Sequence, residues 1–331
     1  MSAKIIHGLL LFLLGGTLAL TAAQEPDQAY FTTRDGYRLP LHHWPASGEP
    51  DHIVLALHGF NDYGGGFQPL ANTLIRHGIS VYAFDQRGFG ATATAGTWPG
   101  QAALVGDAID VLSQLLERYP GSPIYLLGKS MGGAVALLAT AHENASGVAG
   151  VVLVAPAVWG RGTMGWHHRA GLWLGTRLTP GMELSADLAM ELGVEPTDDA
   201  EVLAELRRNP LVQRTARVDT LDGLTELMSA ALDASTAVNS PTLVLYGQQD
   251  DVIPAEPICI LLERLHGTNP DNLRTALYPD GFHMLTRYSG SAATHADIAA
   301  WLRSSPEPLP SGHETEPLTA TENLCDDRPE E

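Results

Sequence analysis

Short apolar runs alternate with longer amphipathic runs along most of this chain. Runs typical of β-strands lie at residues 52–57, 80–84, 124–127, 151–154, 242–246 and 274–278. Between and after them, apolar positions recur at helical spacing in residues 67–77, 102–119, 131–142 and 292–303. Two further strands, at 30–33 and 37–44, flank a turn near the start. This alternation predicts an α/β fold in which a mostly parallel sheet carries helices on both faces.

The alternation stops between residues 158 and 238, where no clear strand is visible. This stretch carries Trp159, Trp166 and Trp173, together with helical segments at 198–208 and 221–234. We therefore predict a helical cap, residues 158–238, inserted between two parts of an α/β core, residues 24–157 and 239–303. Residues 304–331 are rich in Pro, Glu, Thr and Ser, which predicts a disordered acidic tail.

The first residues have the features of an export signal. Lys4 is the only charged residue before Glu25, residues 5–20 are apolar, and small residues at 21–23 precede Gln24. We expect residues 1–23 to be a signal peptide and the mature protein to be periplasmic or secreted. The alternative is a membrane anchor that is not cleaved, because the uncharged stretch is nearly long enough to span a bilayer.

Charge and cysteine content narrow the range of partners. The 331 residues carry a formal net charge of −19, which disfavours binding to nucleic acid or to an anionic membrane surface.

Cys259 and Cys325 have no metal-like spacing to another Cys or to a His, and neither is supported as a nucleophile. A disulfide between them would tie a disordered tail to the body, so we do not expect one. The sequence indicates no metal or other cofactor.

The main chemical signal is the pattern G-x-S-x-G at residues 128–132. It lies between an apolar strand and a helix of small and aliphatic residues, which is the context that a nucleophile elbow requires. The turn is tight enough that a Cβ at Gly128 or Gly132 would collide with a neighbouring element, and it holds Ser130 in a strained conformation. A chain with 34 glycines can contain this pattern by chance. Residues farther along the chain therefore decide whether Ser130 is a catalytic serine.

A serine hydroxyl becomes a good nucleophile when a base accepts its proton and a carboxylate orients that base. In sheets of this type the order along the chain is Ser, then Asp or Glu, then His, on loops at the carboxyl ends of strands. Asp250 follows the strand at 242–246, and His283 follows the strand at 274–278. We therefore predict a Ser130–Asp250–His283 triad, with Asp251 as the competing acid.

Acyl transfer also needs N–H donors directed at the developing oxyanion. The backbone N–H of Met131, the residue after the nucleophile, is one expected donor. The second is expected from the loop that follows the strand at 52–57, and we assign it to the backbone N–H of Phe60. We interpret His58, at the start of this loop, as a structural hydrogen-bonding residue.

Together these motifs resemble the monoacylglycerol lipase and lysophospholipase group of α/β-hydrolases. The resemblance spans about Tyr30 to Arg303 and rests on H-G-F at 58–60, D-Q-R-G-F-G at 85–90, G-K-S-M-G-G at 128–133, G-Q-Q-D at 247–250 and G-F-H at 281–283. It implies the same triad and oxyanion hole, a helical cap over the site, and a structural role for Asp85 and Arg87. Lys129 stands where this group often has His.

From these observations we expect a serine hydrolase that cleaves carboxylic esters of monoacyl lipids, either monoacylglycerols or lysophospholipids. The apolar content of the cap favours an acyl slot above Ser130, with substrate-binding residues near Trp159, Trp166 and Trp173. The alternative is that these residues only pack the cap onto the sheet. The expected partner is a small lipid or ester substrate, which would also bring the protein into transient contact with lipid surfaces.

Other functions fit the same fold, because fold does not fix substrate. A small-ester carboxylesterase or a serine aminopeptidase-like amidase would use the same triad. A third alternative is a binding protein without catalytic activity. The sequence does not indicate an oligomeric state.

Overall fold

A single sheet forms the centre of the computed structural model, which describes residues 29–142, 147–191, 193–303 and 307–325. In this part of the chain nine strands pair in the order β1-β2-β4-β3-β5-β6-β9-β10-β11. Within this order, the neighbouring strands from β4 through β3, β5, β6 and β9 to β10 are parallel. The strands are β1 (Tyr30–Thr32), β2 (Arg38–Trp44), β3 (His52–Leu57), β4 (Ile79–Phe84), β5 (Ile124–Lys129), β6 (Val148–Val154), β9 (Thr242–Gly247), β10 (Leu273–Tyr278) and β11 (Glu314–Thr315). The predicted α/β fold is therefore confirmed.

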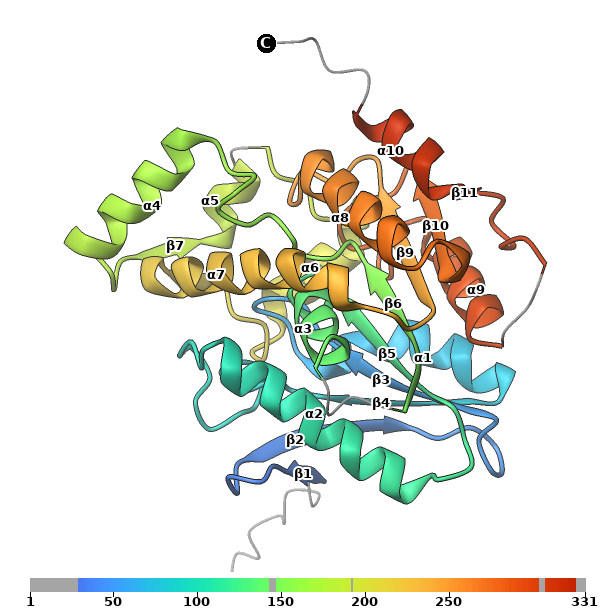
Figure 1. Cartoon of the computed structure of the whole chain (residues 1–331). Coiled ribbons are helices and arrows are strands. Elements are labelled where there is room, and N and C mark those ends of the chain that lie inside the picture. The colour runs from blue at the N-terminus through green and yellow to red at the C-terminus, as the bar shows by residue number, and fades with distance from the viewer. Residues whose placement is uncertain (1–28, 143–146, 192, 304–306, 326–331) are drawn as a thin grey trace, which may run out of the picture.

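Helices cover both faces of this sheet (Figure 1). On one face lie α2 (Gln101–Arg118), α3 (Met131–Thr140) and α8 (Ala255–Thr268), and on the other lie α1 (Gln68–Leu74) and α9 (Ser291–Leu302). Alternate residues of β3 separate the two apolar clusters: Ile53 and Leu55 belong to one, and Val54 and Ala56 to the other. This is the period of two that a strand buried on both faces produces. Short 3₁₀ turns lie at Gly64–Phe67, Ile75–His77, Ser235–Ala237 and Pro270–Asn272.

The cap segment, residues 158–238, contains more than helices. Its helices are α4 (Trp166–Leu178), α5 (Ala186–Glu191), α6 (Ala200–Arg208) and α7 (Val218–Ala234). The strands β7 (Glu183–Ser185) and β8 (Thr215–Arg217) pair antiparallel in a separate two-stranded sheet. The expectation that this segment holds no strand is therefore wrong, because strands of three residues are too short to show an alternating pattern.

The predicted disordered tail is also corrected by the structure. β11 pairs antiparallel with β10, and α10 (Pro317–Cys325) packs against α8, where Cys259 and Cys325 form a disulfide. Leu309 and Ala320 are only 2% and 0% exposed. A few apolar anchors thus fix a segment whose overall composition is polar, and they bring the two cysteines to a Cα–Cα distance of 6.7 Å.

The predicted signal peptide, residues 1–23, lies outside the described residues. Among the residues that are described, none of the helices combines the length and the apolar character needed to cross a bilayer.

The disulfide yields a first prediction. Cys325→Ser should lower the free energy of unfolding in urea by up to about 4 kcal/mol, the chain-entropy value for cysteines separated by 66 residues. A reducing agent should shift the midpoint of the wild type to the same extent and leave that of the variant unchanged. A wild-type midpoint that does not respond to the reducing agent would show that the disulfide does not contribute to stability.

Candidate active site

Ser130 occupies a sharp turn between β5 and α3. Its φ of 53° and ψ of −120° lie outside the conformations that residues with a side chain favour. A Cβ on Gly128 would overlap the carbonyl of Gly132, and one on Gly132 would overlap the carbonyl of Leu57. The two glycines therefore allow the strand and the helix to approach closely enough to form the turn.

Unusual backbone conformations are concentrated at this edge of the sheet. Among the described residues, the non-glycine positions with positive φ are Asn61 (60°), Ser130 and Ala155 (44°). They follow β3, β5 and β6, which are adjacent in the sheet. Strain of this kind persists where the surrounding structure enforces it, commonly at functional sites.

The structure brings the three predicted triad residues into one hydrogen-bonded chain. His283 Nε2 lies 2.9 Å from Ser130 Oγ, and His283 Nδ1 lies 2.8 Å from Asp250 Oδ2. The side chain of His283 is 10% exposed and that of Asp250 is fully buried. The imidazole can therefore accept the serine proton while the carboxylate fixes its tautomer.

The two candidate acids occupy different environments. Asp250 Oδ1 accepts hydrogen bonds from the backbone N–H groups of Val252 (2.8 Å) and Ile253 (2.9 Å), which leaves Oδ2 for His283. Asp251 is an exposed turn residue. The geometry thus favours Asp250 as the orienting acid.

Two backbone N–H groups remain available for an oxyanion. Met131 is the first residue of α3, so its N–H has no partner within the helix. The loop, turn and side-chain hydrogen bonds of the described residues include none from the N–H of Met131 or from that of Phe60. Phe60 belongs to a four-residue turn, residues 59–62, that is closed by a 3.3 Å bond from Asp62 N–H to the carbonyl of Gly59.

His58, Asp85 and Arg87 have structural contacts, as the sequence suggests. His58 is completely buried, and its Nε2 accepts the N–H of Gln86. Burial lowers the pKa of His58, so the imidazole is neutral near neutral pH. Asp85 accepts the N–H of Gly64, and Arg87 bridges carboxylates outside the site.

The cap contacts both loops of the site. The N–H of Gln213 donates to the carbonyl of Asn61 at 2.9 Å, next to Phe60. Thr197 Oγ1 donates to the carbonyl of Arg287 at 2.8 Å, and the N–H of Met284 donates to the carbonyl of Pro196 at 2.8 Å. The loop that carries His283 and the turn that carries Phe60 are therefore both held by cap residues.

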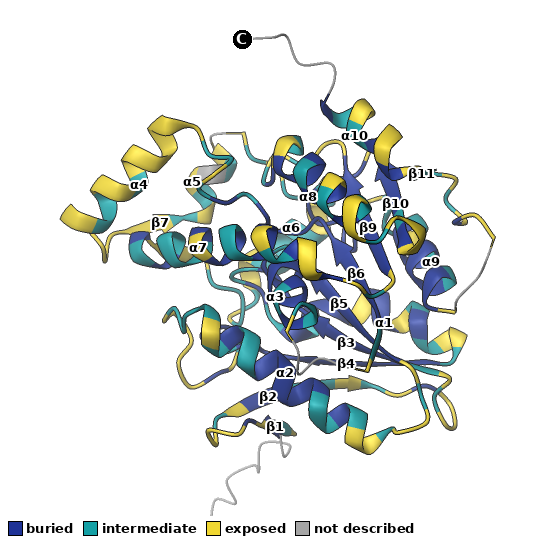
Figure 2. Ribbon diagram, in the orientation of Figure 1, coloured by how far each residue is buried: buried dark blue, intermediate teal, exposed yellow. Residues whose placement is uncertain are grey.

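The three cap tryptophans, near which we expect the substrate-binding residues, differ in their burial. Trp159 is partly buried against the main core cluster. Trp166 and Trp173, by contrast, lie on α4 with 75% and 53% of their surface exposed. Figure 2 shows α4 as an almost entirely exposed helix that projects from the body. Helical spacing of apolar residues does not tell whether the apolar face is covered, and here it is not.

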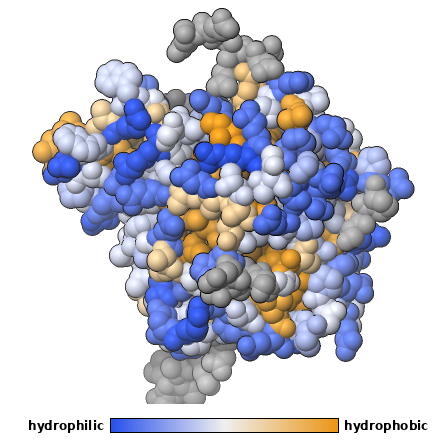
Figure 3. All heavy atoms as spheres, viewed as in Figure 1, coloured by the Kyte–Doolittle hydropathy of each residue, from blue (hydrophilic) through white to orange (hydrophobic). Residues whose placement is uncertain are grey.

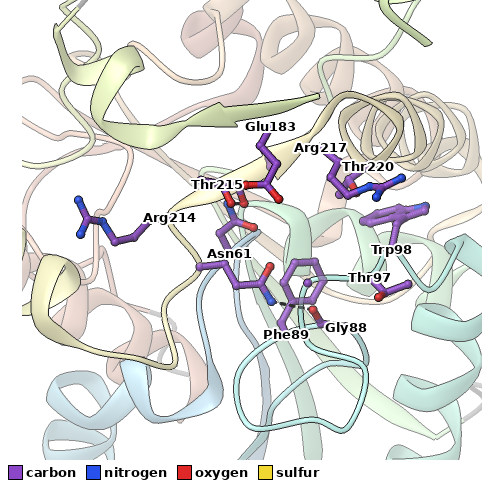
Figure 4. A pocket seen from close by; sticks show the side chains of 13 residues that line it. Asn61, Gly88, Phe89, Thr97, Trp98, Glu183, Arg214, Thr215, Arg217 and Thr220 are labelled. Atoms are coloured by element: carbon purple, nitrogen blue, oxygen red, sulfur yellow. Dashed lines mark hydrogen bonds between the residues drawn. The ribbon is translucent and has the colours of Figure 1, made fainter. Parts of the chain in front are cut away.

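A cavity of about 200 Å³, lined by both polar and apolar groups, lies between the cap and the core (Figure 4). Its cap wall includes Glu183, Thr215 and Arg217, and its core wall includes Asn61 and Trp98. The cavity adjoins the turn of residues 59–62 through Asn61, the residue after Phe60. Its lining combines hydrogen-bond donors and acceptors with the aromatic side chains of Phe89 and Trp98.

A buried ion pair next to Ser130 is the feature that the sequence did not predict. Lys129 Nζ lies 2.5 Å from Asp62 Oδ2, and both side chains are less than one tenth exposed. The two residues are 67 positions apart, and the sequence carries no signal that pairs them. Across the described residues, no group of three or more His, Cys, Asp or Glu side chains is arranged to hold a metal ion.

Comparison with known proteins identifies the family. The family model described as serine aminopeptidase, S33, matches residues 48–287. The chain belongs to this family. The S33 match includes most of both parts of the core, the whole cap and the three residues of the hydrogen-bonded chain.

Relatives of the S33 chain include monoglyceride lipases. Human monoglyceride lipase is 34% identical over 139 residues, which cover 40% of this chain and 44% of the human protein. The match thus spans less than half of the human protein. Monoacylglycerol lipase of Mycolicibacterium smegmatis is 24% identical over 277 residues, which cover 81% of this chain and 94% of the relative.

Solved structures support the same architecture for this S33 member. The monoacylglycerol lipase of Paleococcus ferrophilus matches with a TM-score of 0.64 and 23% identity, covering 81% of this chain and 99% of that chain. A soluble variant of monoglyceride lipase from Saccharomyces cerevisiae matches with a TM-score of 0.70 and 20% identity, covering 86% and 97%. At these identities the likeness shows the α/β-hydrolase fold.

The contacts of the two acids yield a second prediction. Asp250→Asn should reduce kcat about 10⁴-fold, because an amide at this position stabilises the wrong tautomer of His283. Asp251→Asn, the matched control, should change kcat no more than a few-fold, since its side chain is exposed. Steady-state hydrolysis of a p-nitrophenyl ester measures both. A larger loss in the Asp251 variant would reassign the acid.

Proposed function

We propose that this S33 member is a serine hydrolase that cleaves the carboxylic ester of monoacyl lipids. The observation that carries the proposal is the hydrogen-bonded chain from Ser130 Oγ through His283 to Asp250, with distances of 2.9 and 2.8 Å. These distances are those of a nucleophile with its base and its orienting acid.

In the proposed reaction, Ser130 Oγ attacks the ester carbonyl while His283 Nε2 accepts the hydroxyl proton. The carbonyl oxygen becomes an oxyanion and is bound by the N–H groups of Phe60 and Met131. The intermediate then collapses, and His283 donates its proton to the alcohol that leaves. Water, deprotonated by the same imidazole, then attacks the acyl carbonyl, and the fatty acid leaves as the bond to Ser130 Oγ breaks and His283 returns the proton to Oγ. Asp250 stabilises the imidazolium at both steps.

Several observations support a monoacyl lipid as the substrate. The human and mycobacterial relatives are named monoglyceride and monoacylglycerol lipases. The cavity beside Asn61 presents both hydrogen-bonding and apolar groups, as a glycerol head group requires. Apolar side chains of the turn of residues 59–62, the cap and the Asp250 loop are only partly buried against the core, and they are the candidates for contact with the acyl chain: Phe60, Trp159, Met164, Leu224 and Val252.

A second candidate is favoured by one observation. The matching family model is described as a serine aminopeptidase, and an amidase would use the same nucleophile, base and acid. Such an enzyme would cleave aminoacyl amides in preference to monoacyl esters.

The exposed face of α4 supports a further part of this proposal, contact with a lipid surface. Trp166, Trp173, Leu174 and Leu178 are all at least half exposed. They are distributed along α4, and Figure 3 shows apolar atoms among polar ones in this part of the cap. The sequence of α4 carries arginines and no acidic residue, although the whole chain has a net charge of −19. An apolar helix face with a basic flank is suited to the interface of a membrane.

Export from the cytoplasm also forms part of the proposal. It rests on the predicted signal peptide, residues 1–23, and is supported by the disulfide between Cys259 and Cys325. Disulfides form and persist in oxidising compartments such as the periplasm and the extracellular space.

The third prediction tests the reaction and the substrate class together. In a series of monoglycerides assayed below their aggregation limits, kcat/KM should rise about fourfold per added CH₂ until the acyl surface is filled, since each buried CH₂ contributes about 0.8 kcal/mol. Ser130→Ala should lose turnover by about 10⁴-fold or more and should no longer react with a fluorophosphonate probe.

Assays with lysophospholipids, methyl esters of the same chain length and aminoacyl amides separate the alternatives. Faster cleavage of aminoacyl amides would favour the aminopeptidase. A flat profile from acetyl to decanoyl would point to a small-ester carboxylesterase. Probe labelling that persists in Ser130→Ala would overturn the assignment of the nucleophile.

The fourth prediction concerns α4. Trp166→Ser/Trp173→Ser should reduce partitioning onto phosphatidylcholine vesicles about tenfold or more, because two large apolar side chains no longer insert. Hydrolysis of a monomeric short-chain ester should stay within about twofold of the wild type. Leu318→Ser is the matched control, because Leu318 is 52% exposed on α10, outside the cap. Equal vesicle binding by the wild type and both variants would exclude α4 as the contact.

A further inference from the structure

Two separate segments supply the two proposed oxyanion donors. Phe60 lies in the turn of residues 59–62 after β3, and Met131 follows the nucleophile after β5. An oxyanion hole works only if its donors have the right separation, because each must reach the same oxygen at about 2.7–3.1 Å. Whatever fixes the turn relative to the elbow therefore contributes to the stabilisation of the transition state.

The Lys129–Asp62 ion pair connects these same two segments. Lys129 directly precedes Ser130, and Asp62 is the last residue of the turn that holds Phe60. A Cβ on Gly59 would lie 3.5 Å from Lys129 Cε and 3.3 Å from Ser130 Cβ, so the lysine stem runs directly beneath the turn. Asp62 Oδ1 also accepts the N–H of Tyr63 at 3.0 Å, which fixes the orientation of the carboxylate.

The environment keeps the Asp62 carboxylate charged. Burial by itself would raise the pKa of Asp62, but the adjacent Lys129 ammonium and further cationic groups bring it below its usual value. One of these groups is Arg287, on the loop of His283, whose Nη1 borders the same glycine, Gly66, as the Asp62 carboxylate. Arg287 in turn pairs through Nη2 with Glu205 of the cap.

Stability alone is a weak explanation for such a pair. Removing two charges from water is costly, and replacing a buried ion pair by apolar side chains is often neutral or stabilising. The apolar clusters on both faces of the sheet already hold β3 and β5 together. What the pair adds is a directed connection from the elbow to the end of a strained turn.

We propose that Lys129 and Asp62 are positioning residues that set the separation of the Phe60 and Met131 N–H groups. The proposal rests on the serine hydrolase function proposed above. Neither side chain touches the reacting atoms. The pair acts by holding the turn of residues 59–62 against the elbow, so its loss affects the oxyanion more than the bound substrate.

The test uses variants that leave no buried charge unpaired, because removing one partner alone would destabilise the protein. Lys129→Met/Asp62→Asn and Lys129→Met/Asp62→Leu both break the connection. In either variant kcat for a monoglyceride should fall about 10- to 100-fold, less than the loss of a complete oxyanion donor. KM should stay within about threefold of the wild type, and the urea midpoint should be nearly unchanged.

A second measurement, inhibitor affinity, isolates the effect of the variants on oxyanion binding. An alkyl trifluoromethyl ketone adds to the serine and places a negatively charged oxygen in the oxyanion hole. An alkyl ether alcohol of the same chain length has no carbonyl group, so it only occupies the site. Affinity for the ketone should fall by the same factor as kcat, and affinity for the ether should not change. Arg274→Met/Glu314→Gln is the control: it removes a partly buried ion pair between β10 and β11, and kcat should stay at the wild-type value.

The outcomes separate this proposal from the proposed function. A folded double variant with wild-type kcat and ketone affinity would overturn the positioning role and leave the hydrolase intact. Failure of both double variants to fold would assign the pair to stability and would also overturn it. Failure of the hydrolase function itself would appear instead as activity that survives in Ser130→Ala.

Discussion

The backbone of Ser130 is the constraint on which the rest of the site depends. Its positive φ exists only because Gly128 and Gly132 allow β5, α3 and the end of β3 to approach without side chains between them. Once the turn is fixed, Ser130 N–H donates to Val154 of β6, and its carbonyl accepts from Ala157. The elbow is therefore held by its neighbours in the sheet, and the strained geometry is maintained by the core.

The remaining parts of the site lie on loops that the cap holds in place. Gln213 binds the turn that carries Phe60, while Pro196 and Thr197 bind the loop that carries His283. The cap therefore contributes to the geometry of the site. Because these bonds join the cap to the loops of the core, a displacement of the cap would alter the positions of His283 and Phe60 together.

Sequence reasoning predicted the features that depend on local apolar patterns and on the order of motifs along the chain. Apolar runs predicted the core strands, and the chain order of Ser130, Asp250 and His283 predicted which side chains meet. The burial of Lys129 and Asp62 could not be foreseen, because nothing local links an acid in one turn to a lysine in another. The exposure of Trp166 and Trp173 was missed for a related reason: whether an apolar face is covered depends on tertiary packing.

The C-terminal segment shows how little composition says about a few decisive contacts. An unpaired edge strand is a template for association with other chains, and short or covered edges avoid this. Here β11 adds only Glu314 and Thr315 to the edge of β10. So short a strand cannot hold itself in place, and its attachment depends on α10, which follows it and packs on α8. The disulfide between Cys259 and Cys325 fixes the far end of α10. The short strand at the edge of the sheet is therefore linked through α10 to the disulfide.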